Sequence, residues 1–371
     1  MKPDFLNTRA FKKYNQKKAY LELKGQIKEI AIYKGGGGLG DLVMSIPFFG
    51  IFKKAFPKAK ISYMGIIYPR FEKIFRSIDN IDGYIHYERP NKGKGLKKHF
   101  AFRDKMKGKI DLLIDTQRRW ETSFWLKHLQ PKHMLTASPF LSDWPLPQMP
   151  YKKMHIFEQL LVLPARLGMQ DFDKLSNKVD IPVEFKQNAK RFLDVPGQKI
   201  AAIIPSCGMQ FKNWSPDYFA QLADMLSEDG YSIIILGSPS QIELLQEVQD
   251  KMQHKAIVPA LVDISFSKQL LNDAAILEQC DIVVGNDSGG MHLASCLGSV
   301  SATIFGPTTP RKFSPVGPRN IIFYKQLSCS PCRFKCHRKI YRECLELITP
   351  QEVYEACQKF LETMSAKLKE A

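Results

Sequence analysis

The chain has 371 residues, of which 44% are hydrophobic and 25% are charged, so its composition is that of a globular protein with room for two domains. Its 54 Lys and Arg residues exceed its 37 Asp and Glu residues by 17. Such a charge suits nucleic acid, an anionic membrane surface or phosphorylated substrates, and does not choose among them. No apolar run is long enough to cross a bilayer, and residues 1–24 lack the apolar centre of a signal peptide. We therefore expect a cytoplasmic protein, which could also lie peripherally on the inner face of the cytoplasmic membrane.

Residues 1–26 form a basic extension in which aromatic side chains and leucines are interleaved with lysines. A basic amphipathic segment of this kind can lie on anionic lipid. It can equally be a solvated extension that packs partly on the first domain. The sequence leaves both interpretations open.

A glycine-rich loop follows the first predicted strand, residues 27–33. Gly35, Gly37 and Gly40 have the G-x-G-x-x-G spacing of a dinucleotide site. That site also needs an acidic residue after the second strand to hold a ribose, and none follows the strand predicted over 61–65. The dinucleotide interpretation is therefore weak.

Asp41 ends this loop and begins the helix predicted over 42–52. A P-loop would need lysine at this position, and a carboxylate there would repel a phosphate. Asp41 could simply cap the helix. A carboxylate that a glycine turn holds at a cleft could also take a proton from an attacking hydroxyl group, as a general base does.

Further strands are predicted over 84–87 and 112–115, with a lysine-rich connection over 92–109 between them. Gln117, Arg118 and Arg119 follow the second of these strands. An arginine pair at a strand end could hold acceptor phosphates through bidentate hydrogen bonds, or it could be the solvated start of a helix.

The first domain ends in less regular sequence. Residues 138–151 are rich in proline and suggest a loop or lid that faces a cleft. Residues 155–163 favour an amphipathic helix, which Pro164 should kink or end. Residues 171–198 are polar and resemble a connection between domains.

A second α/β pattern begins with a strand predicted over 200–204. The loop that follows contains Ser206, Gly208 and Lys212, and a helix then begins at Ser215-Pro216 with a favoured N-cap pair. A strand over 232–236 ends at Gly237, and the next helix, over 241–251, contains Glu243.

Residues 280–310 read as strand, loop, helix, strand and loop. The first loop consists of Asn286, Asp287, Ser288, Gly289 and Gly290, and the helix that carries His292 begins near Met291. Unpaired backbone N–H groups and the helix dipole favour phosphate at such a helix start. Asp287 and Ser288 could also be ordinary N-cap residues. The loop at 306–308 ends the next strand, and loops at the ends of adjacent strands are where ligands bind in open α/β sheets.

Two motifs carry a resemblance to a known family. The pattern Asp287-Ser288-Gly289-x-x-His292-Leu293-Ala294, followed by Phe305-Gly306-Pro307-Thr308, and the pattern Lys212-x-Trp214-x-Pro216 resemble glycosyltransferase family 9, the heptosyltransferases of lipopolysaccharide core assembly. The resemblance covers most of residues 27–360 and is strongest over 200–216 and 280–310. Gly290 stands where the family usually has proline.

The resemblance implies an α/β chain of the GT-B class, with two facing Rossmann-like domains and a cleft between them. The first domain, 27–185, would bind the acceptor, and the second, 186–348, would bind the nucleotide-sugar. The last helix, over 349–371, would pack back on the first domain. The chain would then be an inverting glycosyltransferase that moves a heptose or related sugar from an ADP-sugar to an anionic, lipid-linked acceptor of the lipopolysaccharide core.

The resemblance also implies roles for individual residues. Asp41 would be the general base, and Lys212 would neutralise charge on the leaving diphosphate. The donor would be bound by Ser206, Gly208, Lys212, Gly237, Glu243, Asp287, Ser288, Gly289, Gly290 and His292. The acceptor would be bound by Gly40, Gln117, Arg118 and Arg119. No cofactor would be required, because the lysine and the backbone dipoles can stabilise the negative charge on the leaving diphosphate.

Two alternative functions are supported by fewer sequence features. An NAD(P)-dependent oxidoreductase would explain only the glycine spacing, and a non-enzymatic basic protein that binds lipid or nucleic acid would explain only the charge. Neither accounts for the Lys-x-Trp and Asp-Ser-Gly motifs together. We therefore expect no nucleic-acid partner.

Cys329, Cys332, Cys336 and Cys344 form a dense cluster near the C-terminus. In a cytoplasmic protein such spacing could provide four thiolates for a structural zinc ion. Reduced structural thiols or a disulfide are the alternatives. A catalytic metal is not expected here, because no carboxylate pair lies nearby in the sequence.

Overall fold

The computed structural model describes residues 17–91, 94–138, 140–144, 151–169, 172, 179–193, 199–332 and 335–370. The chain divides into two compact units. The first unit comprises residues 1–37 and 45–178, and the second comprises 38–44 and 179–371. The domain boundary expected at 185/186 instead falls inside a helix of the second unit, and the second unit also takes residues 38–44 from the glycine loop.

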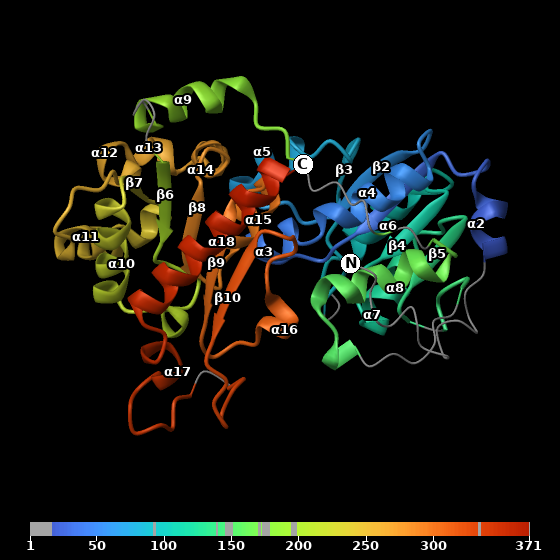
Figure 1. The fold of residues 1–371 in the computed structure, drawn as a ribbon. Coiled ribbons are helices and arrows are strands. Elements are labelled where there is room, and N and C mark those ends of the chain that lie inside the picture. The colour runs from blue at the N-terminus through green and yellow to red at the C-terminus, as the bar shows by residue number, and fades with distance from the viewer. Residues whose placement is uncertain are drawn as a thin grey trace. The chain divides into compact units, whose positions relative to one another are not determined.

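The first unit is built on a five-stranded parallel sheet in the order β3-β2-β1-β4-β5 (Figure 1). Ile30 on β1 pairs with Ile61 on β2 and with Leu112 on β4, so β1 lies between them. These strands are short apolar runs, as expected where both faces of a parallel sheet are covered. The strands are β1 (Glu29–Tyr33), β2 (Lys60–Gly65), β3 (Gly83–His86), β4 (Leu112–Asp115) and β5 (His133–Thr136).

Aromatic side chains contribute to the packing of helices on this sheet. Phe49 on α4 stacks on Tyr63 of β2, with ring centroids 6.2 Å apart. The Tyr20 hydroxyl on α2 donates a hydrogen bond to the Ala55 carbonyl at 3.0 Å. The described part of the basic extension therefore packs on the first unit, whereas its residues 1–16 lie outside the described residues. The helices are α2 (Lys17–Leu23), α4 (Ile46–Ala55), α5 (Pro69–Arg76), α6 (Leu96–Met106), α7 (Trp120–Lys127), η2 (Tyr151–Lys153) and α8 (Ile156–Arg166).

One helix prediction needs correction, and a proline explains it. The single helix expected over 42–52 is two helices, α3 (Leu39–Val43) and α4. Pro47 lies in the first turn of α4, where its missing N–H costs nothing, so it starts a new helix. Pro164 was expected to kink or end its helix, and α8 ends two residues after it, at Arg166. The predicted lid over 138–151 is described only at 138, 140–144 and 151.

The second unit repeats the architecture with a parallel sheet in the order β10-β9-β8-β6-β7. Its strands are β6 (Lys199–Ile204), β7 (Tyr231–Ile235), β8 (Ile282–Asn286), β9 (Val300–Phe305) and β10 (Asn320–Tyr324). Its helices are α3, α9 (Val183–Leu193), η3 (Gln210–Lys212), α10 (Pro216–Glu228), η4 (Pro239–Gln241), α11 (Ile242–Lys251), α12 (Pro259–Val262), α13 (Ile264–Ser267), α14 (Leu270–Leu277), α15 (Gly289–Leu297), α16 (Pro310–Phe313), α17 (Glu343–Glu346) and α18 (Pro350–Glu370).

Helix α18 packs on the second unit. It runs across β9 and β10 (Figure 1), and Val353 and Cys357 on it are fully buried in the same core as α10 and α11. The expectation that the last helix packs back on the first domain stays a prediction. None of the helices in the described part of the chain is long and apolar enough to span a membrane.

Candidate active site

An ion pair lies at the carboxyl ends of β6 and β8. Lys212 follows β6, and its Nζ is 2.9 Å from Oδ2 of Asp287, which follows β8 directly. Nζ also donates to the backbone carbonyl of Asp287 at 2.6 Å, and the Thr308 hydroxyl donates to Oδ2 at 2.6 Å. The chain leaves β6 toward β7 and leaves β8 toward β9 in the opposite direction. Loops diverge at such a switch point, which is the usual ligand position in these sheets.

The loops that carry this pair are held by buried hydrogen bonds. Asn286 accepts a hydrogen bond from the Trp214 backbone N–H at 2.8 Å and donates one to the Pro205 carbonyl at 2.6 Å. The Trp214 indole N–H donates to the Ile348 carbonyl at 2.9 Å, and its side chain is only 1% exposed. Trp214 therefore fixes the position of Lys212, two residues before it, and Asn286 fixes the position of Asp287, the next residue.

The N-terminus of α15 lies next to the ion pair in the chain. Ser288 is its N-cap residue, and the helix begins at Gly289, two residues before the predicted start. The Ser288 hydroxyl is buried and has no hydrogen-bond partner among the described residues. A helix N-terminus supplies unpaired N–H groups and partial positive charge. Helix N-termini and lysine ammonium groups are both features at which proteins bind anions.

Helix α3 packs closely on α15. A Cβ atom on Gly40 would lie 2.9 Å from Cδ2 of His292, and one on Gly289 would lie 2.7 Å from Cβ of Leu39. Both positions therefore need glycine for the approach of α3. A Cβ atom on Gly290 would lie 3.0 Å from Cδ1 of Ile204. In this structure these glycines allow close packing between protein segments.

Asp41 is carried to this region by the same packing, because it follows Gly40 directly on α3. Its Oδ2 atom accepts a hydrogen bond from the Gly38 backbone N–H at 3.3 Å, which is the capping role considered above. The side chain is half-buried. The structure thus brings Asp41 and the Asp287 loop into one unit although 246 residues separate them.

The other predicted donor residues occupy the same edge of the sheet or its exposed loops. Ser206 is buried after β6, and a Cβ atom on Gly237 after β7 would lie 3.2 Å from its Oγ. The same Cβ atom would lie 2.7 Å from Cδ2 of Leu245, so a side chain at 237 would press on the buried Leu245. Gly208 and Glu243 are exposed, on the loop after β6 and in the first turn of α11.

The predicted acceptor residues lie in different places. Gln117 and Arg119 line a cavity of about 210 Å³ in the first unit, together with Gly35 and other residues that follow β1, β2 and β3. This cavity lies at the β1/β4 switch point, where the chain leaves the two strands in opposite directions. Arg118 does not line it, and its guanidinium carbon lies 5.1 Å from the centre of the Tyr151 ring. Gly40 belongs to the second unit.

A buried carboxyl group, Asp115, holds the loop beneath this cavity. It accepts hydrogen bonds from the Gln117 backbone N–H at 2.8 Å, the Ser123 hydroxyl at 2.6 Å and the Thr136 hydroxyl at 3.3 Å. Burial raises the pKa of Asp115 from its ordinary value of 3.8 to about 7, although these hydrogen bonds oppose the rise.

We expect Asp115→Asn to increase the free energy of unfolding relative to wild type, and to do so more at pH 8 than at pH 4.5. Between about pH 4 and 7 the folded wild type keeps a proton that the unfolded chain has lost, so wild-type stability falls as the pH rises, by up to about 4 kcal/mol. Asparagine has no carboxyl group that titrates, so the variant does not lose stability over this pH range. Its amide oxygen can still accept the hydrogen bonds. Urea unfolding at both pH values measures the difference between variant and wild type. Asp104→Asn, at an exposed site on α6, is the control, and a pH-independent difference for Asp115→Asn would contradict the prediction.

The four clustered cysteines all have free thiols. Burial, together with the neighbouring Cys332, Cys329 and Cys336, raises the pKa of the Cys344 thiol, so the four lie near one another. The Arg342 backbone N–H donates to Sγ of Cys336 at 3.2 Å. Within the described residues, no three His, Cys, Asp or Glu side chains are arranged to hold a metal ion.

Some residues of this site were not assigned from the sequence. Thr308 was read only as part of a loop, although the adjacent strands β8 and β9 bring it to Asp287. Asn286 was read as loop sequence, yet it is the last residue of β8 and is fully buried. Arg89 lines the acceptor-side cavity and lies in a segment that had no predicted role. A polar residue directly after a predicted buried strand was the available signal for Asn286.

Comparison with known proteins points to one family. The family model described as glycosyltransferase family 9 (heptosyltransferase) matches residues 100–341. Lipooligosaccharide heptosyltransferase 2 of Campylobacter jejuni subsp. jejuni serotype O:2 is 27% identical, over 87% of this chain and 95% of its own length. Lipopolysaccharide heptosyltransferase 3 of Escherichia coli is 22% identical, over 72% of this chain and 81% of its own.

Solved structures agree on the fold. A family 9 glycosyltransferase of Veillonella parvula DSM 2008 has a TM-score of 0.73 at 21% identity, and covers 91% of this chain and 97% of its own. The ADP-heptose lps heptosyltransferase II of E. coli has a TM-score of 0.70 at 18% identity, and the match covers 91% of this chain and 100% of that protein. The fold is thus the GT-B class of α/β proteins with two Rossmann-like domains, as the sequence predicted.

Proposed function

The chain belongs to glycosyltransferase family 9, and we propose that it moves a heptose from an ADP-heptose donor, with inversion, to an anionic lipid-linked acceptor of the lipopolysaccharide core. The observation that carries this proposal is the Lys212–Asp287–Thr308 cluster at the β6/β8 switch point, beside the N-terminus of α15. The names of the relatives, all heptosyltransferases, support the choice of sugar.

The donor diphosphate would bind between Lys212 and the N-terminus of α15. As the bond between the anomeric carbon and the diphosphate oxygen breaks, negative charge grows on that oxygen, and a fixed ammonium group stabilises it. Asp287 would not contact the diphosphate directly, because like charges repel. It would instead position Lys212, with Thr308 holding the carboxylate in place. Ser288 would offer its unpartnered hydroxyl to the ligand.

Asp41 would act as the general base. The acceptor hydroxyl attacks the anomeric carbon and loses its proton to the Asp41 carboxylate, while ADP leaves from the opposite face. One C–O bond forms as another breaks, and no oxidant or reductant is needed. We expect no metal cofactor for this step, because Lys212 and the backbone N–H groups can carry the charge.

The two units would divide the substrates. The second unit, which carries the donor cluster and Asp41, would bind the nucleotide-sugar. The first unit would bind the acceptor through the cavity lined by Gln117 and Arg119. A lipid-linked acceptor would place the enzyme at the inner face of the cytoplasmic membrane.

Calorimetric titration with ADP, UDP, GDP and CDP, followed by mass spectrometry of transfer products with ADP-heptose, tests this function. We expect selective binding of ADP and an acceptor product that is heavier by one heptosyl unit. Preference for another nucleotide would overturn the donor assignment and leave the fold unaffected. Absence of binding by all four would overturn the transferase mechanism at this site. Fluorescence titration with NADH should show no binding.

A further inference from the structure

Arg342, the N-cap residue of α17, contacts the turn that carries Lys212. Its Nη1 atom donates hydrogen bonds to the Asn213 carbonyl at 2.8 Å and to the Gln210 carbonyl at 3.3 Å. These two carbonyls lie on either side of Lys212 in the chain. We call residues 210–213 the lysine turn. A single guanidinium group therefore bridges both ends of the lysine turn.

The lysine turn has little packing of its own. None of the residues of η3 is buried, and Met209, which precedes η3, is 43% exposed. Within the turn, the Lys212 N–H donates to the Met209 carbonyl and the Asn213 N–H donates to the Gln210 carbonyl, both at 2.9 Å. Segments with few buried side chains and exposed backbone hydrogen bonds open easily. The position of the lysine turn therefore depends on contacts from other parts of the chain.

The residue before Arg342 contacts the same turn. The Tyr341 ring packs edge-on against the Phe211 ring, with centroids 5.9 Å apart. Edge-to-face pairs are a favoured arrangement of aromatic rings. Tyr341 and Arg342 together contact the three other residues of the lysine turn, so the lysine is held from both sides.

The backbone of Arg342 is in an unusual conformation. Its φ of 56° and ψ of 37° lie in the left-handed region. Glycine adopts this conformation without steric cost, whereas the Cβ atom of any other residue crowds the neighbouring carbonyl. Among the described residues, Gln130 is the only other non-glycine residue with a positive φ. An arginine where glycine would fit more easily indicates that the side chain is needed at this position.

The guanidinium group of Arg342 is also incompletely paired. Its Nε atom is buried and has no hydrogen-bond partner among the described residues. Buried polar groups are normally paired, and an unpaired one lowers stability. Residues that cost stability through their backbone or their polar groups are typical of functional sites. The two carbonyls of the lysine turn are the contacts that account for an arginine here.

We propose that Arg342 is a positioning residue of the donor site, because its guanidinium group holds the lysine turn and thereby keeps the Lys212 ammonium group at the leaving diphosphate. The proposal rests on the proposed function for the role of Lys212. A charged group stabilises a transition state well only when it is already in place as the opposite charge develops. Arg342 would thus act through Lys212.

Arg342→Gly is the central test variant. It removes the guanidinium group and also relieves the left-handed backbone, so the variant should unfold at a urea concentration no lower than Arg342→Ala does. Arg342→Lys keeps a positive charge that can still bind one carbonyl. Arg319→Ala is the matched control, because Nη1 of Arg319 also donates to a backbone carbonyl of the second unit, that of Gly298, at 3.0 Å.

Transfer rates with ADP-heptose and calorimetric titrations with ADP and adenosine measure the effect. We expect Arg342→Gly to reduce kcat by about tenfold and ADP affinity by about fivefold, with adenosine affinity within twofold of wild type. Arg342→Lys should lose less than Arg342→Gly, and Arg319→Ala should stay within twofold throughout. In a Lys212→Ala background, Arg342→Gly should change kcat and ADP affinity by less than twofold, because the group that it positions is already missing.

Hydrogen exchange measures the lysine turn without any ligand. Mass spectrometry should show that the backbone amides of Lys212 and Asn213 exchange about tenfold faster in Arg342→Gly than in wild type, and unchanged in Arg319→Ala. If Arg342→Gly did not fold, Arg342→Lys would give the same comparison with a smaller change.

Three outcomes would overturn the proposal: unchanged exchange in the lysine turn, equal losses of ADP and adenosine affinity, or the same loss of kcat with and without Lys212. Failure of the proposed function looks different. If wild type bound no ADP, the donor assignment and the catalytic role of Arg342 would both be wrong, whereas faster exchange would still show that Arg342 holds the turn.

Discussion

Asp41→Asn should reduce transfer by about 10²- to 10⁴-fold while ADP binding stays within twofold of wild type. The amide cannot take a proton from the acceptor hydroxyl, but its oxygen can still accept the hydrogen bond from Gly38 that caps α3. The loss should therefore appear in kcat, with little change in the melting temperature. Transfer rates at saturating donor and acceptor, together with calorimetric titration of ADP, measure both quantities.

A matched variant separates catalysis from capping. Asp263 also caps a helix in the second unit, and its carboxylate accepts hydrogen bonds from the backbone N–H groups of Ser265 and Phe266. Asp263→Asn should lower stability somewhat and leave kcat unchanged. If Asp41→Asn kept at least a third of the wild-type kcat, Asp41 would be a cap only, and the base would have to be sought elsewhere.

The strands could be predicted from the sequence because each carries its own signal. Leu112–Asp115 is a short apolar run that ends at an acidic residue, and β4 has these same bounds. The ion pair between Lys212 and Asp287 could not be predicted as a contact, although both residues were assigned to the donor site. Their contact depends on β6 pairing with β8 while β7 lies on the other side of β6, and local sequence does not encode this order.

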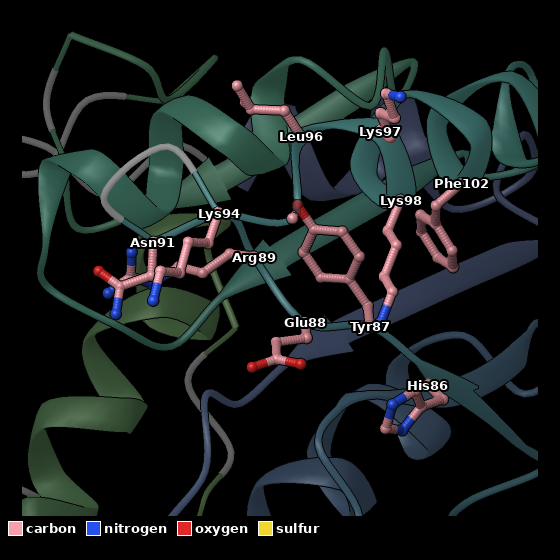
Figure 2. Close-up of a pocket in the computed structure, with 11 residues that line it drawn as sticks. His86, Tyr87, Glu88, Arg89, Asn91, Lys94, Leu96, Lys97, Lys98 and Phe102 are labelled. Carbon is pink, nitrogen blue, oxygen red and sulfur yellow. The ribbon is translucent and has the colours of Figure 1, made fainter.

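Packing partners were the least predictable feature. The apolar stripe of α18 indicates that one face is buried, but a stripe does not say which surface covers it. Val353 and Cys357 in fact pack with the second unit. The segment over 92–109 was read only as a lysine-rich connection between two strands. It borders a pocket (Figure 2) because α6 brings Phe102 onto Tyr87, a contact between residues 15 positions apart that no periodicity reports.

The second large effect is expected at Lys212. Lys212→Ala should reduce kcat by about 10²- to 10³-fold, because a buried ammonium group placed at the leaving diphosphate is then missing when charge develops. The Lys212 side chain is only 15% exposed, so water replaces its charge poorly. The same variant should bind ADP more weakly but bind adenosine as wild type does, since adenosine has no diphosphate. Parallel titrations with ADP, AMP and adenosine therefore show which part of the nucleotide the lysine contacts.

Asp287→Asn and the double variant with Lys212→Ala complete a thermodynamic cycle. If Asp287 acts by positioning Lys212, Asp287→Asn alone should cost roughly tenfold in kcat/KM, and it should cost almost nothing once Lys212 is alanine. Lys325→Ala is the control, because Lys325 is also ion-paired in the second unit, to Glu352 at 2.8 Å, and should leave kcat and ADP affinity unchanged. Equal losses of ADP and adenosine affinity in Lys212→Ala, or additive losses in the double variant, would show that the Lys212–Asp287 pair supports the fold of these loops and does not bind the diphosphate.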